Sequence, residues 1–189
     1  PAPDAPIRDL TSMISHDLRH LDTDNPCVLV VDGSKLVRKL IHAVLQKELP
    51  GVRVAEAGSV AEANAALAAG PVDLVTTALV LPDGDGLQVA RAVREAGGQR
   101  YVPVIVISGD VQSHLEDRRF TEDVTDYFDK GLGHNALAAF IRGYVQPEPI
   151  PDAHVLYIED SRTVAVAIRR LLEAHQMRVT HVTTAEDAI

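Results

Sequence analysis

Short apolar runs alternate with helical patterns over most of this 189-residue chain. The run at residues 28–31 contains no polar residue, as expected for a parallel strand that is buried on both faces. Residues 36–45 then repeat apolar side chains at steps of three and four, and Pro50-Gly51 end that pattern. This alternation predicts a doubly wound α/β domain with a five-stranded parallel sheet, in which the functional site lies at the carboxyl ends of the strands.

The same alternation continues to residue 145 and gives five strands and five helices. A capping box, Ser59 with Glu62, opens an alanine-rich helix, and Gly97-Gly98 stop the helix that begins near residue 87. The other strands are expected at 52–57, 73–81, 104–107 and 125–128, and the other helices within 111–124 and over 136–145.

After a proline-rich linker the chain repeats its own beginning. The sequence VLVVDGS at 28–34 aligns with VLYIEDS at 155–161, and RV at 53–54 aligns with RV at 178–179. Thr183 and Glu186 form a second capping box, which predicts the start of a further helix. We therefore expect a leader with a short amphipathic helix (1–26), a complete domain (27–146), a linker (147–153) and the beginning of a second such domain (154–189). The second copy is too short to bury a core of its own.

The composition is that of an ordinary soluble protein, with 46% apolar and 24% charged residues. A net charge of −9 argues against a nucleic-acid-binding face, and no apolar run is long enough to cross a membrane. The single cysteine, Cys27, excludes an internal disulfide and favours the reducing cytoplasm. The first residues resemble no signal peptide and do not begin with Met, so we expect a cytoplasmic protein and a trimmed sequence.

Polar residues follow the expected strands at characteristic spacings. Asp32 and Gly33 end the first strand, and Ala78 lies four residues before Pro82. Ser108 comes thirty residues after Ala78, Lys130 comes twenty-two residues later, and Tyr127 is just before Lys130. In this pattern residues 27–146 resemble the CheY-like receiver domain of two-component response regulators.

The resemblance implies a phosphoryl-transfer site that is incomplete. In the family an aspartate accepts a phosphoryl group from a histidine kinase, and two acids at the end of strand one hold Mg²⁺. Ala78 occupies the acceptor position and Gly33 the second acidic position. Asp32 alone is a poor Mg²⁺ site, so we interpret this domain as a degenerate receiver without a catalytic residue. The alternative is that Ala78 and Gly33 are engineered or that another acid replaces them.

Several neighbouring residues carry their own expectations. Ser108 matches the family's switch hydroxyl, Tyr127 its aromatic switch position and Lys130 its lysine. We expect Ser108 and Lys130 to be relics, with Lys130 paired to Asp32. The alternative is that these two residues bind a free anion. Gly131 replaces the proline that usually follows the lysine, so the local loop should differ. The two nearby acids, Asp83 and Asp85, are interpreted as solvated turn formers.

The second copy retains both acids, Glu159 and Asp160, which the resemblance assigns to a Mg²⁺ site when that domain is complete. The implied protein is a tandem-receiver response regulator whose partners are a sensor histidine kinase and a C-terminal output domain, with a diguanylate cyclase that makes cyclic di-GMP as the candidate output. The first receiver would serve as an adaptor or dimerisation element. Candidate surfaces are the leader helix and the last helix (Leu137, Phe140, Ile141 and Tyr144), with Leu137 and Ile141 as core residues in the alternative interpretation. We expect no enzyme activity in this chain itself.

Two alternatives stay open. In one, both receivers are unphosphorylated scaffolds. In the other, the chain comes from a hybrid histidine kinase with trailing receivers, because Ser15-His16-Asp17 resembles a kinase phosphate-accepting box. That box lacks its usual Pro-Leu ending and is followed by a receiver, so a chance match is the favoured interpretation. A nucleotide-binding enzyme is disfavoured because no glycine-rich loop follows the first strand.

Overall fold

The computed structural model describes residues 25–109, 123–146, 153–160, 165, 168–169, 172–173 and 176–188. The expected leader helix with His16, most of the expected helix within 111–124, and nearly all of the linker lie outside these residues. The chain divides into two compact units, Thr23–Pro147 and a second unit that includes Glu148–Ile189. Each unit is described by itself.

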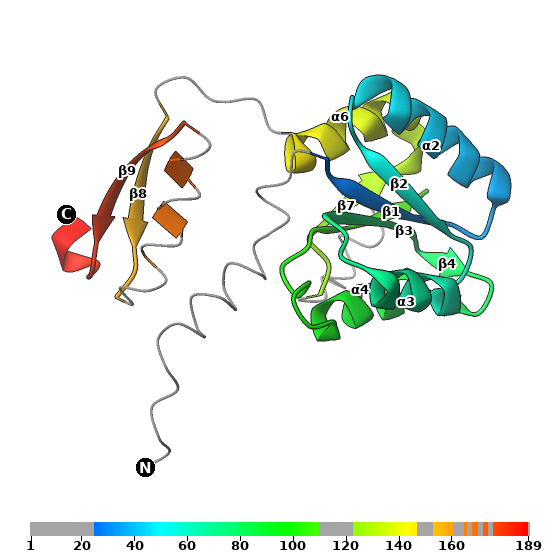
Figure 1. Cartoon of the computed structure of the whole chain (residues 1–189), viewed down its shortest axis with the longest axis horizontal. Coiled ribbons are helices and arrows are strands. Elements are labelled where there is room, and N and C mark those ends of the chain that lie inside the picture. Colours follow the sequence, from blue (N-terminus) through cyan, green and yellow to red (C-terminus); the bar gives the residue numbers. More distant parts are fainter. Residues whose placement is uncertain are drawn as a thin grey trace, which may run out of the picture. The chain divides into compact units, whose positions relative to one another are not determined.

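The first unit is built on a parallel five-stranded sheet with the strand order β2-β1-β3-β6-β7 (Figure 1). The wholly apolar β1 lies between β2 and β3 and is buried along its entire length. This order confirms the predicted doubly wound fold, in which the chain reverses its direction of winding beside the first strand. The strands are β1 (Cys27–Val31), β2 (Arg53–Ala57), β3 (Leu74–Ala78), β6 (Val104–Ser108) and β7 (Asp126–Asp129).

Helices cover both faces of this sheet (Figure 1). Helices α3 (Val60–Ala69) and α4 (Gly86–Glu95) pack on the face that carries Leu29 and Val31 of β1. Helices α2 (Lys35–Glu48) and α6 (His134–Val145) pack on the opposite face, over Val28 and Val30. The predicted cap of α3 is present, because Ser59 accepts a hydrogen bond from the N–H of Glu62. Ser34, which was not predicted as a cap, accepts one from the N–H of Val37 at the start of α2. No helix in the described part of the chain is long and apolar enough to cross a membrane.

The strand predicted over 73–81 is wrong in its second half. β3 ends at Ala78, and the chain then forms a small antiparallel hairpin from β4 (Val80–Leu81) and β5 (Gly84–Asp85). The backbone N–H of Gly86 donates to the carbonyl of Leu79, which folds the chain back at this point. Val80 is therefore 79% exposed, although its apolar neighbours had suggested a continuous strand.

The second unit repeats the strand pairing of the first. β8 (His154–Ile158) pairs in parallel with β9 (Arg178–Val182), and Val155 lies opposite Val179 just as Val28 lies opposite Val54. Residues 165, 168–169 and 172–173 are helical. The helix expected after Thr183 is instead a single 3-10 turn, η3 (Glu186–Ala188). Thr184, rather than Thr183, caps it by accepting the N–H of Asp187.

Candidate functional site

The strand register brings the predicted site residues of the first unit to one edge of the sheet. Val31 of β1 lies opposite Thr77 of β3, and the next residues along each strand are Asp32 and Ala78. Ala78 lies opposite Ile107 of β6, and Ser108 lies opposite Asp129 of β7. Because all these strands are parallel, their carboxyl ends meet at the same edge, and Lys130 follows directly after β7.

Asp32 is held by the turn that leads into α2. Its Oδ1 atom accepts the backbone N–H of Ser34 at 2.7 Å, and its backbone carbonyl accepts a hydrogen bond of 2.6 Å from Nη1 of Arg38. Arg38 also lies 3.6 Å from Glu56 at the neighbouring strand. Burial raises the pKa of Glu56, but the hydrogen bonds and the charge attraction of His42 and Lys39 together outweigh this effect, so the pKa of Glu56 is lowered.

At Gly33 there is little room for the missing second acid. A Cβ atom at this position would lie 3.1 and 3.2 Å from two ring carbons of Pro82. Any side chain here must displace the proline ring by a few tenths of an ångström. The structure therefore offers Asp32 as the one acidic side chain at this strand end, and a single carboxylate does not fit the Mg²⁺ site of a receiver. Within the described residues no three His, Cys, Asp or Glu side chains gather to hold a metal.

Ala78 ends β3 beneath the start of α4. A Cβ atom on Gly86, the first residue of α4, would lie 2.5 Å from the carbonyl oxygen of Ala78 and 2.9 Å from Cγ2 of Thr77. The helix therefore approaches the strand end as closely as a glycine permits. The half-buried methyl group of Ala78 cannot act as a nucleophile.

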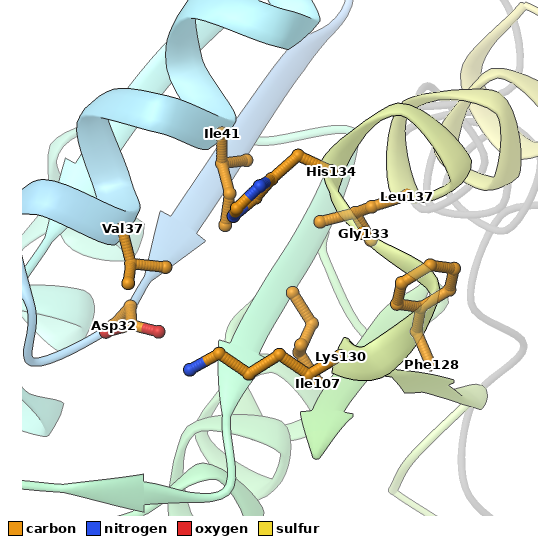
Figure 2. Close-up of a pocket in the computed structure, with 9 residues that line it drawn as sticks. All are labelled: Asp32, Val37, Ile41, Ile107, Phe128, Lys130, Gly133, His134 and Leu137. Carbon is orange, nitrogen blue, oxygen red and sulfur yellow. The ribbon is translucent and has the colours of Figure 1, made fainter. Parts of the chain in front are cut away.

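Lys130 extends toward Asp32 across the mouth of a small cavity between α2 and α6 (Figure 2). The cavity volume is about 20 Å³, enough for a single water molecule. The expected Asp32–Lys130 ion pair is absent from the described residues, where no carboxylate lies within 4.0 Å of the ammonium group. The predicted ion pair is therefore wrong. The carboxylate of Asp32 is held by the N–H of Ser34, and the side chain of Lys130 remains exposed. The cavity is lined by Asp32, Val37, Ile41, Ile107, Phe128, Lys130, Gly133, His134 and Leu137.

The loop after Lys130, which Gly131 predicted to differ from the family's, is a short turn. Residues Lys130–Leu132 form a 3-10 turn, and the N–H of Gly131 donates to Oδ1 of Asp129 at 2.7 Å. Proline could not make this bond because it lacks an N–H. Ser108 is buried at the end of β6. Tyr127 on β7 is half-buried, and its own burial raises its pKa.

The two acids after β4 cap helices. Asp83 is exposed in the turn between β4 and β5, as predicted, and it also caps α3, whereas Asp85 lies on β5 and caps α4. Asp83 accepts the backbone N–H groups of Val60 and Ala61 at 2.7 and 3.0 Å, and these bonds lower its pKa. Asp85 is the N-cap of α4 and accepts the N–H of Gln88 at 2.9 Å. The Asp85–Gln88 spacing was a capping signal in the sequence. No local signal reveals Asp83, because its partners lie more than twenty residues earlier.

In the second unit Glu159 and Asp160 directly follow β8. The hydroxyl of Tyr157 donates to Oε2 of Glu159 at 3.3 Å, and Nε2 of His181 is 2.8 Å from the backbone carbonyl of Glu159. Neither Tyr157 nor His181 was predicted from the sequence. The available signal was the repeat itself, because Tyr157 stands where the first copy has Val30.

Comparison with known proteins identifies the family and its fold. The family model for the response regulator receiver domain matches residues 28–142. The chain belongs to the receiver domain family. Its match therefore covers the sheet edge described above, from β1 to α6.

Curated relatives include both kinases and regulators. The sensor histidine kinase TmoS of Ectopseudomonas mendocina is 27% identical over 175 residues, which is 91% of this chain and 18% of that protein. The KDP operon transcriptional regulatory protein KdpE of Escherichia coli (strain K12) is 30% identical over 115 residues, 61% of this chain and 49% of that protein. The chain thus spans less than half the length of these relatives.

Solved structures show the same fold. The receiver domain of the sensor histidine kinase PA1611 from Pseudomonas aeruginosa PAO1, solved with magnesium in its active site cleft, matches with a TM-score of 0.55 and 21% identity. This match covers 64% of the chain and 98% of that domain. The chemotaxis response regulator CheY4 of Vibrio cholerae matches with a TM-score of 0.51 and 21% identity, covering 62% of the chain and 96% of that protein.

Proposed function

We propose that the first unit is a phosphorylation-incompetent receiver in a cytoplasmic two-component signalling protein, where it acts as an adaptor or dimerisation element. The observation that carries this proposal is Ala78 at the carboxyl end of β3, opposite Ile107 and beside Asp32. A methyl group has no lone pair with which to attack a phosphoryl group. Gly33 removes the second acid that would hold the metal, so nucleophile and metal site are lost together.

The test is covalent phosphorylation of the chain. The 189-residue protein is incubated with a small phosphodonor and Mg²⁺, and its intact mass is measured. We expect no added phosphoryl group on residues 25–146. A stable addition there that is released by treatment that cleaves acyl phosphates would overturn the proposal. Ala78→Asp combined with Gly33→Asp is the matched positive control.

We further propose that residues 154–188 begin a second receiver. Support comes from the repeated register of β8 and β9 and from two equivalent backbone bonds, Asp32 N–H to Ala57 and Glu159 N–H to Val182, both 3.1 Å long. On β8, Leu156 and Ile158 are 51% and 47% exposed. In the first unit the equivalent side chains of β1 are buried beneath α3 and α4. Helices of the same kind would cover the exposed face in a complete receiver.

In this proposal Glu159 and Asp160 would hold Mg²⁺ in the completed second receiver. The metal would neutralise negative charge on the transferring phosphoryl oxygens. The phosphoryl donor is a sensor histidine kinase, and a C-terminal output domain, such as a diguanylate cyclase, reads the phosphorylated state. The encoded sequence after Ile189 tests this, because the third strand must end in an aspartate. If no apolar strand there ends in one, the phosphorylation role fails and the scaffold alternative is favoured.

One observation favours a second candidate. The alignment with the sensor histidine kinase TmoS covers 91% of the chain and therefore extends across both units. In this alternative the two units are receivers within a longer hybrid kinase. The parent protein would then carry an ATP-binding domain and label itself with radioactive ATP. A parent protein that accepts phosphoryl groups only from a separate kinase would exclude it.

A further inference from the structure

The first unit leaves large apolar side chains exposed on the side where α2 and α6 pack together. Leu36 and Leu40 of α2 are 69% and 44% exposed, and Leu132 in the turn before α6 is 64% exposed. Ala43 of α2 and Ala139 of α6 are exposed as well. We call these five residues the α2–α6 patch. A group of exposed apolar side chains on a soluble protein commonly marks a site where a partner binds.

The patch lies along the junction of the two helices. On one flank of α2, Arg38 and His42 contact Glu56 of β2. Leu36 and Leu40 each precede one of these residues by two positions, which is about 200° around a helix. The two leucines therefore lie on the other flank of α2. That flank faces α6, because α2 and α6 pack side by side on the same face of the sheet (Figure 1).

The two helices that carry the patch are basic, although the whole chain has a net charge of −9. Together they contain five Lys or Arg side chains and one acid, Glu48. Lys47 and Arg142 share Glu48 as an ion-pair partner, and Lys39 pairs with Glu56 of β2. Five cations therefore stand against two acids, so the surroundings of the patch keep an excess of positive charge.

We propose that the α2–α6 patch docks an amphipathic helix of a partner protein, with an apolar stripe flanked by Asp and Glu. This inference rests on the proposed adaptor role and names the surface that performs it. The stripe would pack on Leu36 and Leu40, as helices do in apolar grooves, and the acids would meet the surrounding cations. A second copy of the same face would bring like charges together, which opposes self-association. Leu137 and Ile141 of α6 are buried core residues and take no part.

The experiment measures binding of a labelled helical peptide to the 189-residue chain by fluorescence anisotropy. The acidic peptide has about three heptads with leucine at positions a and d and glutamate at e and g, where repulsion between glutamates keeps it from pairing with itself. The basic peptide has lysine in place of glutamate. We expect the acidic peptide to bind about tenfold more tightly than the basic one. Its affinity should fall as salt is added.

Two variants place a carboxylate inside the patch. Leu36→Glu and Leu40→Glu should each weaken binding of the acidic peptide by about tenfold. Tyr101→Glu is the matched control, because it makes the same change in net charge at a residue that is 58% exposed in the loop before β6. The control should bind the acidic peptide like the wild type. Because all three side chains are exposed, the thermal midpoint should stay the same in each variant.

The docking surface is overturned if neither peptide binds, if both bind equally, or if Leu36→Glu and Leu40→Glu bind like the control. A dimer seen by light scattering, or sedimentation with vesicles of phosphatidylserine and phosphatidylcholine, would also overturn it if Leu36→Glu abolished that association. The patch would then belong to a second copy or to a membrane surface. The measured mass after phosphodonor treatment is independent of these outcomes, so failure of the docking surface is distinguishable from failure of the proposed function.

Discussion

Replacing Gly86 with alanine should destabilise the receiver domain, because this glycine lets the start of α4 approach the end of β3. The added Cβ atom would lie 2.5 Å from the carbonyl oxygen of Ala78 and 2.9 Å from Cγ2 of Thr77. The nearest of these atoms belongs to the backbone of a central strand, so it cannot move aside as a flexible side chain would. The helix would have to shift away from the strand end.

The magnitude follows from overpacking at a buried site. Inserting one carbon into a well-packed interior costs about 1–3 kcal/mol. Because the added carbon would contact a backbone oxygen, we expect Gly86→Ala to destabilise the domain by about 2–3 kcal/mol, toward the upper end of this range. For a domain of about 120 residues, 1 kcal/mol corresponds to about 4 °C in the thermal midpoint. We therefore expect the midpoint to fall by about 10 °C.

Gly143→Ala provides the matched control. Gly143 also lies in a helix, α6, but a Cβ atom there meets no other atom within 4 Å. Alanine is favoured over glycine inside helices by about 0.5–1 kcal/mol, so this variant should be slightly more stable than the wild type. Thermal unfolding followed by circular dichroism measures both variants. A Gly86→Ala protein as stable as the wild type would refute the close approach on which the reasoning depends.

Three further predictions concern the site and its supports. Ala78→Asp alone should leave Mg²⁺ binding weak. Adding Gly33→Asp should strengthen Mg²⁺ binding, although the new side chain displaces Pro82. Equal Mg²⁺ affinities of the wild type and the double variant, measured by calorimetry, would contradict this prediction. Burial, with a hydrogen bond to a carboxylate, raises the pKa of Tyr144 to about 12. Because the tyrosine of the unfolded chain ionises near pH 10, the folded state should lose stability as the pH rises from about 10 to about 12. One of the four tyrosines should titrate by ultraviolet absorbance near pH 12, and four equal titrations near pH 10 would count against the bond. Asp83 has a lowered pKa, so its capping of α3 is complete above about pH 4 and lost as pH falls below that. Asp83→Asn should therefore weaken the acid dependence of unfolding, and identical acid-unfolding curves would exclude the cap.

The sequence alone was enough for the fold because its signals are local. Strands β1 and β6 are largely apolar runs, and Ser34, Ser59 and Asp85 cap α2, α3 and α4 from within the same few residues. The repeat of residues 28–34 at 155–161 also predicted a second strand-helix-strand unit, whose strands β8 and β9 pair in the register of β1 and β2. The positions of Gly33 and Ala78 follow from spacing to neighbouring motifs, and their loss of function stays a prediction that the phosphorylation experiment tests.

Only the tertiary structure decided which polar groups meet across long sequence separations. Asp73, predicted as an ordinary strand residue, is buried and accepts the N–H of Cys27 from 46 residues away. Asp83 caps a helix that precedes it, and Tyr157 reaches the carboxylate of Glu159 beside a histidine on the next strand. The prediction of an Asp32–Lys130 ion pair was wrong because the sequence does not give the distance between these two side chains. Charge complementarity is readable in a sequence, but the distance between two groups depends on turns and helix ends that form only when the whole domain packs.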